Sequence, residues 1–350
     1  MVEQRDGVGP RTRRATLRDV GALAGVSFKT VSRVVNGEPG VSDELAERVR
    51  AAARQLNYRP NHTASVLRKR DGRSMSIGLI VEDVVNPFFA AIHRGLEAAA
   101  MGGGYSVLTG SVLDSTTRER ELVETFSARR VDGLVVSPND DLVETLALER
   151  RNGVVVVYID RVPGRLDADA VVSDNRAGAR AGVEHLLASG HRRVAMVGDT
   201  HTIHTAEERF LGYVEAHAAH GVPLDPTLQA RDVHGGDAAT EAAGRILDLA
   251  DPPTALFTAQ NMLTVGAVRA LRARGLQHQV ALVGFDDFLL SDLLDPPVTV
   301  VAQDPDEIGR IAAERLMARI EGDMSPPQVH VVPTTLLPRG SGELPPPAAG

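Results

Sequence analysis

A short stretch near the N-terminus holds the side chains best suited to binding a polyanion. Lys29 and Arg33 can reach guanine edges or phosphates, and the hydroxyls of Thr30 and Ser32 can hydrogen-bond to phosphate oxygens. Phe28 can contact the methyl group of thymine. These residue types on the outward face of one helix are what recognition of double-stranded DNA requires.

Signals for catalysis are weaker. The chain has no Cys, which excludes disulfide frameworks, thiol nucleophiles and cysteine-based zinc fingers. His201 and His204 are three residues apart, as are His217 and His220, but neither pair has a third metal ligand at a suitable spacing. We interpret them as solvated histidines, of which the first pair could border a ligand cleft. No phosphate-binding P-loop or G-x-S-x-G elbow occurs, so we expect no metal, no cofactor and no enzyme.

Charge is distributed unevenly along the sequence. Residues 1–70 hold 14 Lys and Arg against 7 Asp and Glu, which leaves 24 basic and 39 acidic residues for the rest of the chain. A basic head on an acidic body indicates a polyanion partner for the head alone. A solvated basic face is the alternative that charge leaves open.

The length of 350 residues predicts two or three domains. A hydrophobic fraction of 43% and a charged fraction of 24% are typical of a globular chain. The basic N-terminus is not followed by an apolar run, and no stretch resembles a membrane span. We therefore expect a cytoplasmic protein.

The elements that must position the basic face are three short helices. Thr16 can cap the first with Asp19 answering it, and Gly25 permits a tight turn. Ser27 can cap the second helix, and a third begins at Ser42. Two short helices across a glycine turn, supported by a third, form the helix-turn-helix pattern, with a purely structural three-helix bundle as the alternative.

After residue 73 short β-rich runs alternate with helical stretches, which predicts parallel sheets covered by helices. About 265 residues are too many for one such sheet, so we predict two Rossmann-like lobes with a ligand cleft at the carboxyl ends of the strands. The strands are expected at 76–81, 106–109, 133–136, 154–159, 194–197, 255–257 and 281–283, and the helices near 87–101, 117–130, 140–151, 175–189, 205–219, 237–249 and 262–274.

The residues from Thr16 to Arg68 strongly resemble the DNA-binding head of the lactose/galactose-repressor type (LacI/GalR) of transcription regulators. The matching motifs are D-V-x-x-x-A-G-V-S, T-V-S-R-V-x-N and L-x-Y-x-P-N. The resemblance implies that Phe28, Lys29 and Arg33 read bases, and that Thr16, Ser27, Thr30, Ser32 and Asn36 anchor the DNA backbone. It also implies a hinge helix that forms on DNA, with contacts from Asn61, Ala64, Leu67 and Arg68. Leu67 would then be a wedge in the minor groove.

The resemblance continues through V-S-D-N at 172–175, R-F-L-G-Y at 209–213 and V-G-F-D-D at 283–287. It implies a two-lobed periplasmic-binding-protein fold whose chain crosses between lobes near 160–174, 286–303 and 324–330. The family usually carries Asn-Asp where this chain has Gln260-Asn261, so a standard hexose contact cannot be assumed. The implied effector contacts are Asn86, Phe88, Phe89, Ser137, Asp160, Arg161, Arg209, Gln260, Asn261 and Asp286.

These inferences predict a small all-α helix-turn-helix head joined to a two-lobed α/β core. The expected domains are a disordered tail at 1–15, the head at 16–60, a hinge at 61–73, a core at 74–340 and a flexible tail at 341–350. Within the core, one lobe is expected at about 74–160 and 304–324, and the other at about 174–286 and 330–340.

The predicted function is a sequence-specific transcription regulator, expected to repress, that binds a pseudo-palindromic operator as a homodimer. A small-molecule effector between the lobes, expected to be a sugar or sugar derivative, would control its DNA affinity. The alternatives are a regulator that depends on a purine or nucleoside corepressor, a solute-binding protein, and an α/β enzyme.

Overall fold

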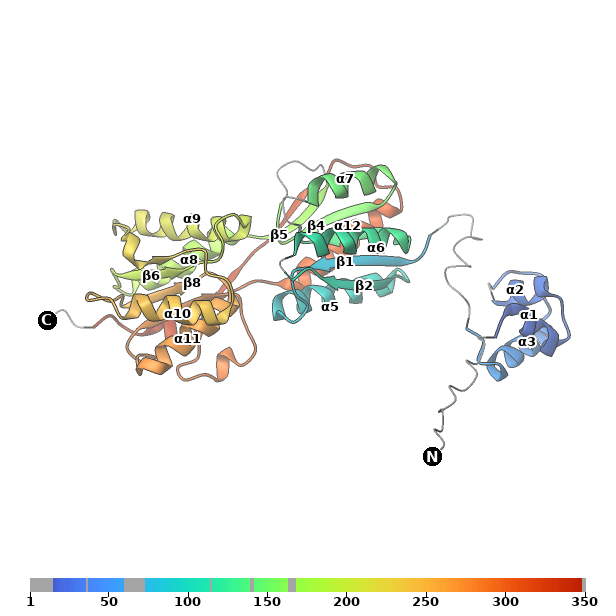
Figure 1. Cartoon of the computed structure of the whole chain (residues 1–350), viewed down its shortest axis with the longest axis horizontal. Coiled ribbons are helices and arrows are strands. Elements are labelled where there is room, and N and C mark those ends of the chain that lie inside the picture. The colour runs from blue at the N-terminus through green and yellow to red at the C-terminus, as the bar shows by residue number, and fades with distance from the viewer. Residues whose placement is uncertain are drawn as a thin grey trace, which may run out of the picture. The chain divides into compact units, whose positions relative to one another are not determined.

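The computed structural model describes residues 15–35, 37–59, 73–113, 115–138, 142–162 and 168–347. The chain divides into two compact units, Met1–Ser74 and Met75–Gly350 (Figure 1). Among the described residues, no helix is both long and apolar enough to span a membrane.

The first unit contains three helices, α1 (Leu17–Ala24), α2 (Phe28–Val35) and α3 (Asp43–Gln55). As predicted, Thr16 and Asp19 form a capping box at the start of α1, with the Thr16 amide 2.7 Å from the Asp19 carboxylate. The Ser27 hydroxyl accepts the Thr30 amide at 3.2 Å, which caps α2. A small core joins the helices through Val20, Ala24, Val31, Val49 and Ala52.

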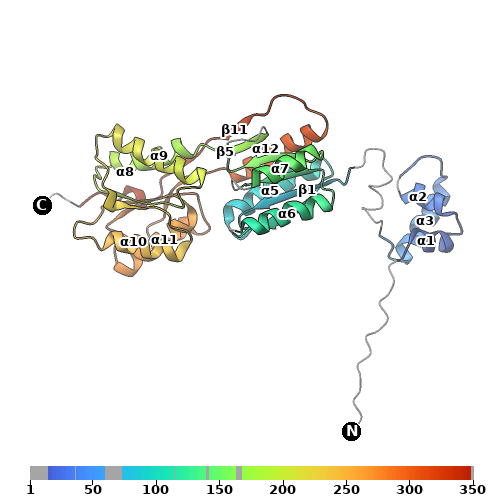
Figure 2. The same cartoon turned by 45° about the horizontal axis from the view of Figure 1, so that its top comes forward.

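The second unit consists of two lobes, each built on a six-stranded sheet. In the N-terminal lobe the strand order is β11-β5-β4-β3-β1-β2, and every pairing is parallel. Its strands are β1 (Ser76–Val81), β2 (Ser106–Ser111), β3 (Gly133–Val136), β4 (Val155–Ile159), β5 (Asp169–Ser173) and β11 (Val329–Val332). Figure 2 shows β11 beside β5.

In the C-terminal lobe the order is β12-β10-β9-β8-β6-β7, and only the β10–β12 pairing is antiparallel. Its strands are β6 (Val194–Val197), β7 (Gln229–Ala230), β8 (Ala255–Thr258), β9 (Ala281–Phe285), β10 (Thr299–Ala302) and β12 (Thr335–Leu337). The central strands β6, β8 and β9 are buried throughout and are apolar except for Thr258, as expected for parallel strands covered on both faces.

Helices cover both faces of each sheet. In the C-terminal lobe α8 (Asn175–Ala188) and α9 (His204–Ala219) lie on one face, opposite α10 (Gly236–Leu247) and α11 (Asn261–Arg274) (Figure 1). In the N-terminal lobe α5 (Pro87–Gly102) and α12 (Pro305–Ile320) pack on one face, while α6 (Thr116–Ala128) and α7 (Val143–Arg151) contribute to the core of the other. The predicted fold class is confirmed.

Helices α5 and α12 approach so closely that their contact requires glycine. A Cβ atom on Gly95 would lie 2.1 Å from the Asp306 carbonyl oxygen, and one on Gly309 would lie 2.1 Å from the Ile92 carbonyl oxygen. Any side chain at either position would therefore push the two helices apart.

The first two crossings between the lobes fall at the ends of their predicted ranges, and the third falls beyond its range. Because β5 belongs to the N-terminal sheet and β10 to the C-terminal sheet, the first two crossings lie near residue 174 and at 303–304. The third lies at 333–334, since β11 still belongs to the N-terminal sheet. Residues 169–173 and 329–332 are thus part of the N-terminal lobe.

Two further sequence expectations were wrong. Helix α12 was not among the predicted helices, although Asp304 caps it by accepting the Glu307 amide at 3.0 Å. The chain beyond Arg339 was expected to be flexible, yet Ser341 is 3% exposed and donates to the Leu282 carbonyl at 2.6 Å. The carbonyl of Leu344 also accepts from the ring of His191 at 2.9 Å, so residues 341–347 pack on the C-terminal lobe.

Candidate effector cleft and DNA-binding face

Helix α2 presents the candidate DNA-reading side chains on its outer face. Phe28 is 46% exposed and Lys29 is also exposed, while Val31 on the opposite face is fully buried. A side chain as apolar as Phe28 gains nothing from water, so its exposure is consistent with a contact surface.

Several other side chains predicted to contact DNA form hydrogen bonds or ion pairs within the first unit. The Thr16 hydroxyl donates to Asp19 at 2.7 Å, and the hydroxyls of Ser27 and Thr30 are 2.9 Å apart. Arg33 donates to the Pro39 carbonyl at 2.7 Å and lies 3.8 Å from the Glu38 carboxylate. Ser32 is partly buried on α2. The remaining predicted contacts, Asn36, Asn61, Ala64, Leu67 and Arg68, lie outside the described residues.

A cleft lies where the carboxyl ends of the strands of both sheets meet. Side chains that follow β1 and β4 line it from the N-terminal lobe, and those near β6, β8 and β9 line it from the C-terminal lobe. Its lining residues are Glu82, Asn86, Phe88, Phe89, Asp160, Arg161, Asp199, Ile203, Thr205, Ala206, Arg209, Gln260, Asp286 and Gln303.

Eight of the ten predicted effector contacts line this cleft, and the other two touch residues that do. Ser137 lies 3.4 Å from the Asp160 carboxylate, and Asn261 donates its amide to Asp286 at 3.3 Å. The sequence left open whether His201 and His204 border the cleft. Neither side chain lines it, although the neighbouring Ile203 and Thr205 do, and His201 lies 2.6 Å from Asp232.

Sequence reasoning missed six lining residues, Glu82, Asp199, Ile203, Thr205, Ala206 and Gln303. Glu82 directly follows β1, so the rule that ligands bind at carboxyl strand ends could have found it. The same rule could have found Gln303, but β10, the strand before it, was not predicted.

Arg209 is the best-anchored charge in the C-terminal half of the cleft. Its side chain is 6% exposed and donates to Asn175 at 2.8 Å and to the Ala259 carbonyl at 2.7 Å. The guanidinium lies 4.0 Å from the ring centroid of Phe285 and 4.0 Å from the Asp286 carboxylate. These contacts fix the guanidinium before any ligand arrives.

The N-terminal half of the cleft carries a second, smaller charge cluster. Arg161 lies 3.2 Å from Glu82 and 3.6 Å from Asp160. Burial raises the pKa of the Asp160 carboxyl above its usual range, and the nearby charges of Arg161 and Arg209 only partly oppose this.

A hydrogen bond joins the lobes at the cleft. The side-chain amide of Asn261, at the start of α11, donates to the Asn86 side-chain oxygen at 2.8 Å. Asn86 caps α5 by accepting the Phe88 amide at 3.1 Å, so the two helices of different lobes meet through the cap residue of α5 and the first residue of α11.

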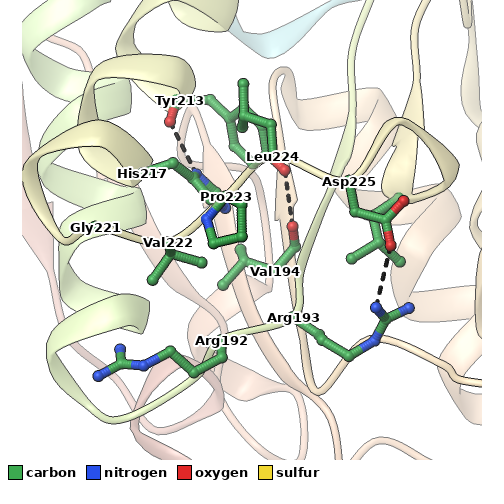
Figure 3. A pocket seen from close by; sticks show the side chains of 11 residues that line it. Arg192, Arg193, Val194, Tyr213, His217, Gly221, Val222, Pro223, Leu224 and Asp225 are labelled. Carbon is green, nitrogen blue, oxygen red and sulfur yellow. Dashed lines mark hydrogen bonds and ion pairs between the residues drawn. The ribbon is translucent and has the colours of Figure 1, made fainter.

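A second hollow lies within the C-terminal lobe, lined in part by Tyr213 and His217 of α9 (Figure 3). Its polar groups bind one another: the Tyr213 hydroxyl donates to the Val194 carbonyl at 2.8 Å, and Arg193 lies 3.1 Å from Asp225. Burial lowers the pKa of His217, whose neutral ring donates to the Tyr213 carbonyl at 3.0 Å. None of the predicted site residues lines this hollow.

Within the described ranges, no group of three or more His, Asp or Glu side chains could hold a metal ion.

The chain matches two family patterns. Residues 16–61 match the family described as "Bacterial regulatory proteins, lacI family", and residues 183–342 match the "Periplasmic binding protein-like domain".

Full-length relatives decide the family. The chain is 30% identical over 329 residues to the HTH-type transcriptional repressor CytR of Escherichia coli K12, covering 93% of this chain and 96% of CytR. It is 34% identical over 343 residues to the HTH-type transcriptional regulator CelR of Thermobifida fusca, covering 95% and 99% of the two chains. This chain belongs to the LacI family.

Solved structures agree with that assignment. The lac repressor dimer bound to operator and the anti-inducer ONPF matches with a TM-score of 0.82 and 27% identity, over 94% of this chain and 99% of that chain. The CelR–cellobiose complex matches with a TM-score of 0.71 and 32% identity, over 94% and 100% of the two chains. As a LacI-family member, this chain is a sequence-specific DNA-binding transcription regulator and not an enzyme.

Proposed function

We propose that an uncharged polar molecule, a sugar or sugar derivative, binds in the cleft between the lobes and sets the affinity of this regulator for its operator. The observation that carries the proposal is that two polar side-chain atoms at the cleft lack hydrogen-bond partners. The side-chain oxygens of Gln260 and Gln303 are buried and, among the described residues, have no hydrogen-bond partner. Buried acceptors without a donor are costly, and ligand hydroxyls would satisfy them.

The charges of the cleft argue against an anionic ligand. Four carboxylates line the cleft against two guanidiniums. Arg209 donates hydrogen bonds to Asn175 and to the Ala259 carbonyl, and Arg161 forms ion pairs with Glu82 and Asp160. A phosphate or carboxylate on the ligand would therefore enter a site whose described lining holds more carboxylates than guanidiniums.

Nine of the ten predicted effector contacts, all except Asn261, remain the residues we assign to this ligand, with Glu82, Asp199 and Gln303 added. The CelR–cellobiose complex, similar over nearly the whole chain, supports a sugar. A nucleoside is the second candidate, because Phe88 and Phe89 form an edge-to-face ring pair with centroids 5.1 Å apart at the cleft, where a base could pack.

We further propose that the regulator is a repressor that binds a pseudo-palindromic operator as a homodimer in the cytoplasm, where the DNA is. The solved lac repressor dimer on its operator supports the homodimer. Leu289, Leu290 and Leu293 of the C-terminal lobe are 80%, 55% and 73% exposed, and a second chain would cover such a surface.

On the DNA, Phe28, Lys29 and Arg33 are proposed to read bases. Arg33 would leave Glu38 to do so, at small cost because the pair is exposed. Thr16, Ser27, Thr30, Ser32 and Asn36 are proposed to position the head on phosphates. The hinge residues Asn61, Ala64, Leu67 and Arg68 are proposed to enter the minor groove at the operator centre.

The proposed mechanism is linkage between two sites. An effector that prefers one closure angle of the lobes shifts the separation of the N-terminal lobes in the dimer. The paired hinges then either fit the operator or do not. Operator DNA must reciprocally change effector affinity by the same factor.

Matched pairs of neutral and anionic ligands test the effector proposal. Ribose and ribose 5-phosphate, cellobiose and cellobionate, and adenosine and its 5′-monophosphate are titrated against the full chain, with unfolding temperature and operator affinity as readouts. The neutral member of a pair should raise the unfolding temperature and shift operator affinity. An anionic member that binds more tightly than its neutral partner would overturn the proposal.

A further inference from the structure

Asn86 and Asn261 lie 175 positions apart in the sequence, in different lobes, and are joined by a hydrogen bond of 2.8 Å. Asn261 is 1% exposed, so the bond lies in a region shielded from water. A hydrogen bond in such surroundings is stronger than one in water, and each of its partners is costly to leave unpaired.

The direction of this bond is fixed at both ends. The Asn86 side-chain oxygen also accepts the Phe88 amide at 3.1 Å, so turning the Asn86 amide over would remove the cap of α5. The Asn261 side-chain oxygen accepts the Met262 amide at 2.7 Å, so turning this side chain over would lose that bond. Asn261 must therefore donate and Asn86 must accept.

Asn261 also contacts a residue that lines the cleft. The backbone amide of Asn261 donates to the Asp286 carboxylate at 3.3 Å, and Asp286 lines the cleft together with Asn86. Asn261 itself does not line the cleft. Its side chain contacts the opposite lobe, whereas its backbone helps to hold a candidate effector contact.

We propose that Asn86 and Asn261 form an interlobe latch that stabilises the closed cleft before an effector binds. An asparagine at position 261 is essential to the latch, because a carboxylate there would place its oxygen against the oxygen of Asn86. Asn261 is accordingly a positioning residue that sets the closed fraction, and hence the effector affinity, without touching the ligand.

The fixed direction of the bond gives two substitutions of the same charge with opposite outcomes. Asn86→Asp keeps an acceptor that can cap α5 and makes the bond charge-assisted, so it should strengthen the latch. Asn261→Asp replaces the donor with an acceptor and should break the latch. Each change should shift the ratio of closed to open molecules by about fivefold, in opposite directions.

The latch is measured without effector, so that ligand contacts play no part. Because the chain has no Cys, Glu124→Cys on α6 and Glu241→Cys on α10 provide one exposed label site in each lobe. Single-molecule energy transfer between the two dyes then reports the interlobe distance of the full-length chain, with one labelled chain per assembly. Asn152→Asp, exposed at the end of α7, is the control for the charge change.

The closed population should rise in Asn86→Asp, fall in Asn261→Asp and stay unchanged in Asn152→Asp. The double variant Asn86→Asp/Asn261→Asp should be the most open, since two carboxylates would then face each other. Equal shifts in both single variants, or none in either, would overturn the latch. If Asn261→Asp does not fold, Asn86→Asp decides the question alone, because Asp is as good a helix cap as Asn.

Discussion

The two lobes repeat one strand order and differ in how they hold their cleft carboxylates. β1 to β5 followed by β11 correspond in order to β6 to β10 followed by β12. Asp160 directly follows β4 and Asp286 directly follows β9, and both adopt positive φ values, of 65° and 70°. Their amides donate to Val171 and Val301 at 3.0 and 2.9 Å, so the two acids occupy equivalent places.

The surroundings of the two acids differ. Asp286 receives the Gln303 side-chain amide and the Asn261 backbone amide, and it faces Arg209. Asp160 has the Ser137 hydroxyl at 3.4 Å and Arg161 at 3.6 Å, and burial raises its pKa. A non-glycine residue at positive φ is strained, and strain of this kind persists at functional sites. The C-terminal lobe thus offers a preorganised polar surface, whereas the N-terminal lobe holds a carboxylate that is costly to ionise.

The largest effect is expected from Arg209→Ala. The substitution leaves Asn175 and Asp286 without their buried guanidinium, which should lower the free energy of unfolding by about 3 kcal/mol and effector affinity by about 100-fold. Arg161→Ala in the N-terminal lobe should lower the free energy of unfolding and the effector affinity by less than half as much as Arg209→Ala does. Denaturant unfolding and effector titration measure both, with Arg269→Ala on the exposed face of α11 as the control. Equal losses in the two lobes would contradict the comparison.

A second pair of equivalent positions lies at the starts of β5 and β10. Asp169 is 2% exposed and accepts Arg319 at 2.8 Å and the Gln328 amide at 2.8 Å, while Thr299, fully buried, accepts the Arg339 amide at 3.0 Å. Burial acts to raise the pKa of Asp169, but the hydrogen bonds from Arg319 and Gln328 and the charge of Arg315 outweigh it, so this pKa lies below its usual range.

Asp169→Asn should therefore destabilise the second unit by about 3 kcal/mol at neutral pH, and Thr299→Val by about 1 kcal/mol. Because the folded-state pKa is lowered, the stability due to Asp169 is present above the unfolded pKa of about 4. It is lost as the pH falls through the folded-state value. Between pH 7 and pH 3, the difference in free energy of unfolding between the parent and Asp169→Asn should thus become smaller as the pH falls. If the difference in free energy of unfolding between the two proteins is unchanged at pH 3, the loss comes from packing.

The smallest effect is expected from Asp160→Asn. Because the folded-state pKa of Asp160 is raised, the parent loses stability as the pH rises from about 4, where the unfolded carboxyl ionises, to that raised value. The variant has no carboxyl to ionise. Its stability relative to the parent should rise across that window and then stay level, as denaturant unfolding at several pH values will measure. A variant less stable than the parent at pH 8 would mean that ionised Asp160 is well stabilised.

Sequence patterns predicted those features that depend on residues close together in the chain, such as helix caps and long apolar strands. The capping residues Thr16 and Ser27 sit where the sequence placed them, and long apolar runs such as β4 were recognised. Helix α12 was missed even though Asp304 and Pro305 are start signals for a helix.

What sequence reasoning missed depends on distant partners. β5 has only three apolar residues between two polar ones, and β11 has exposed valines, so neither carries the pattern of a long buried strand. Each becomes a strand by pairing across the sheet with residues far along the chain. The contact of Asn261 with Asn86 likewise exists only once the lobes are in place, and Gln303 could not be assigned to the cleft before β10 was known.

Selection of random DNA duplexes by the purified full-length chain, followed by sequencing of the retained DNA, shows whether the chain is a dimeric operator-binding regulator. We expect a pseudo-palindrome with a fixed centre, since two α2 faces of a dimer would read its half-sites and two hinges its middle. Retention of DNA with no enriched sequence, or with a single half-site and no symmetry, would contradict a dimeric operator-binding regulator.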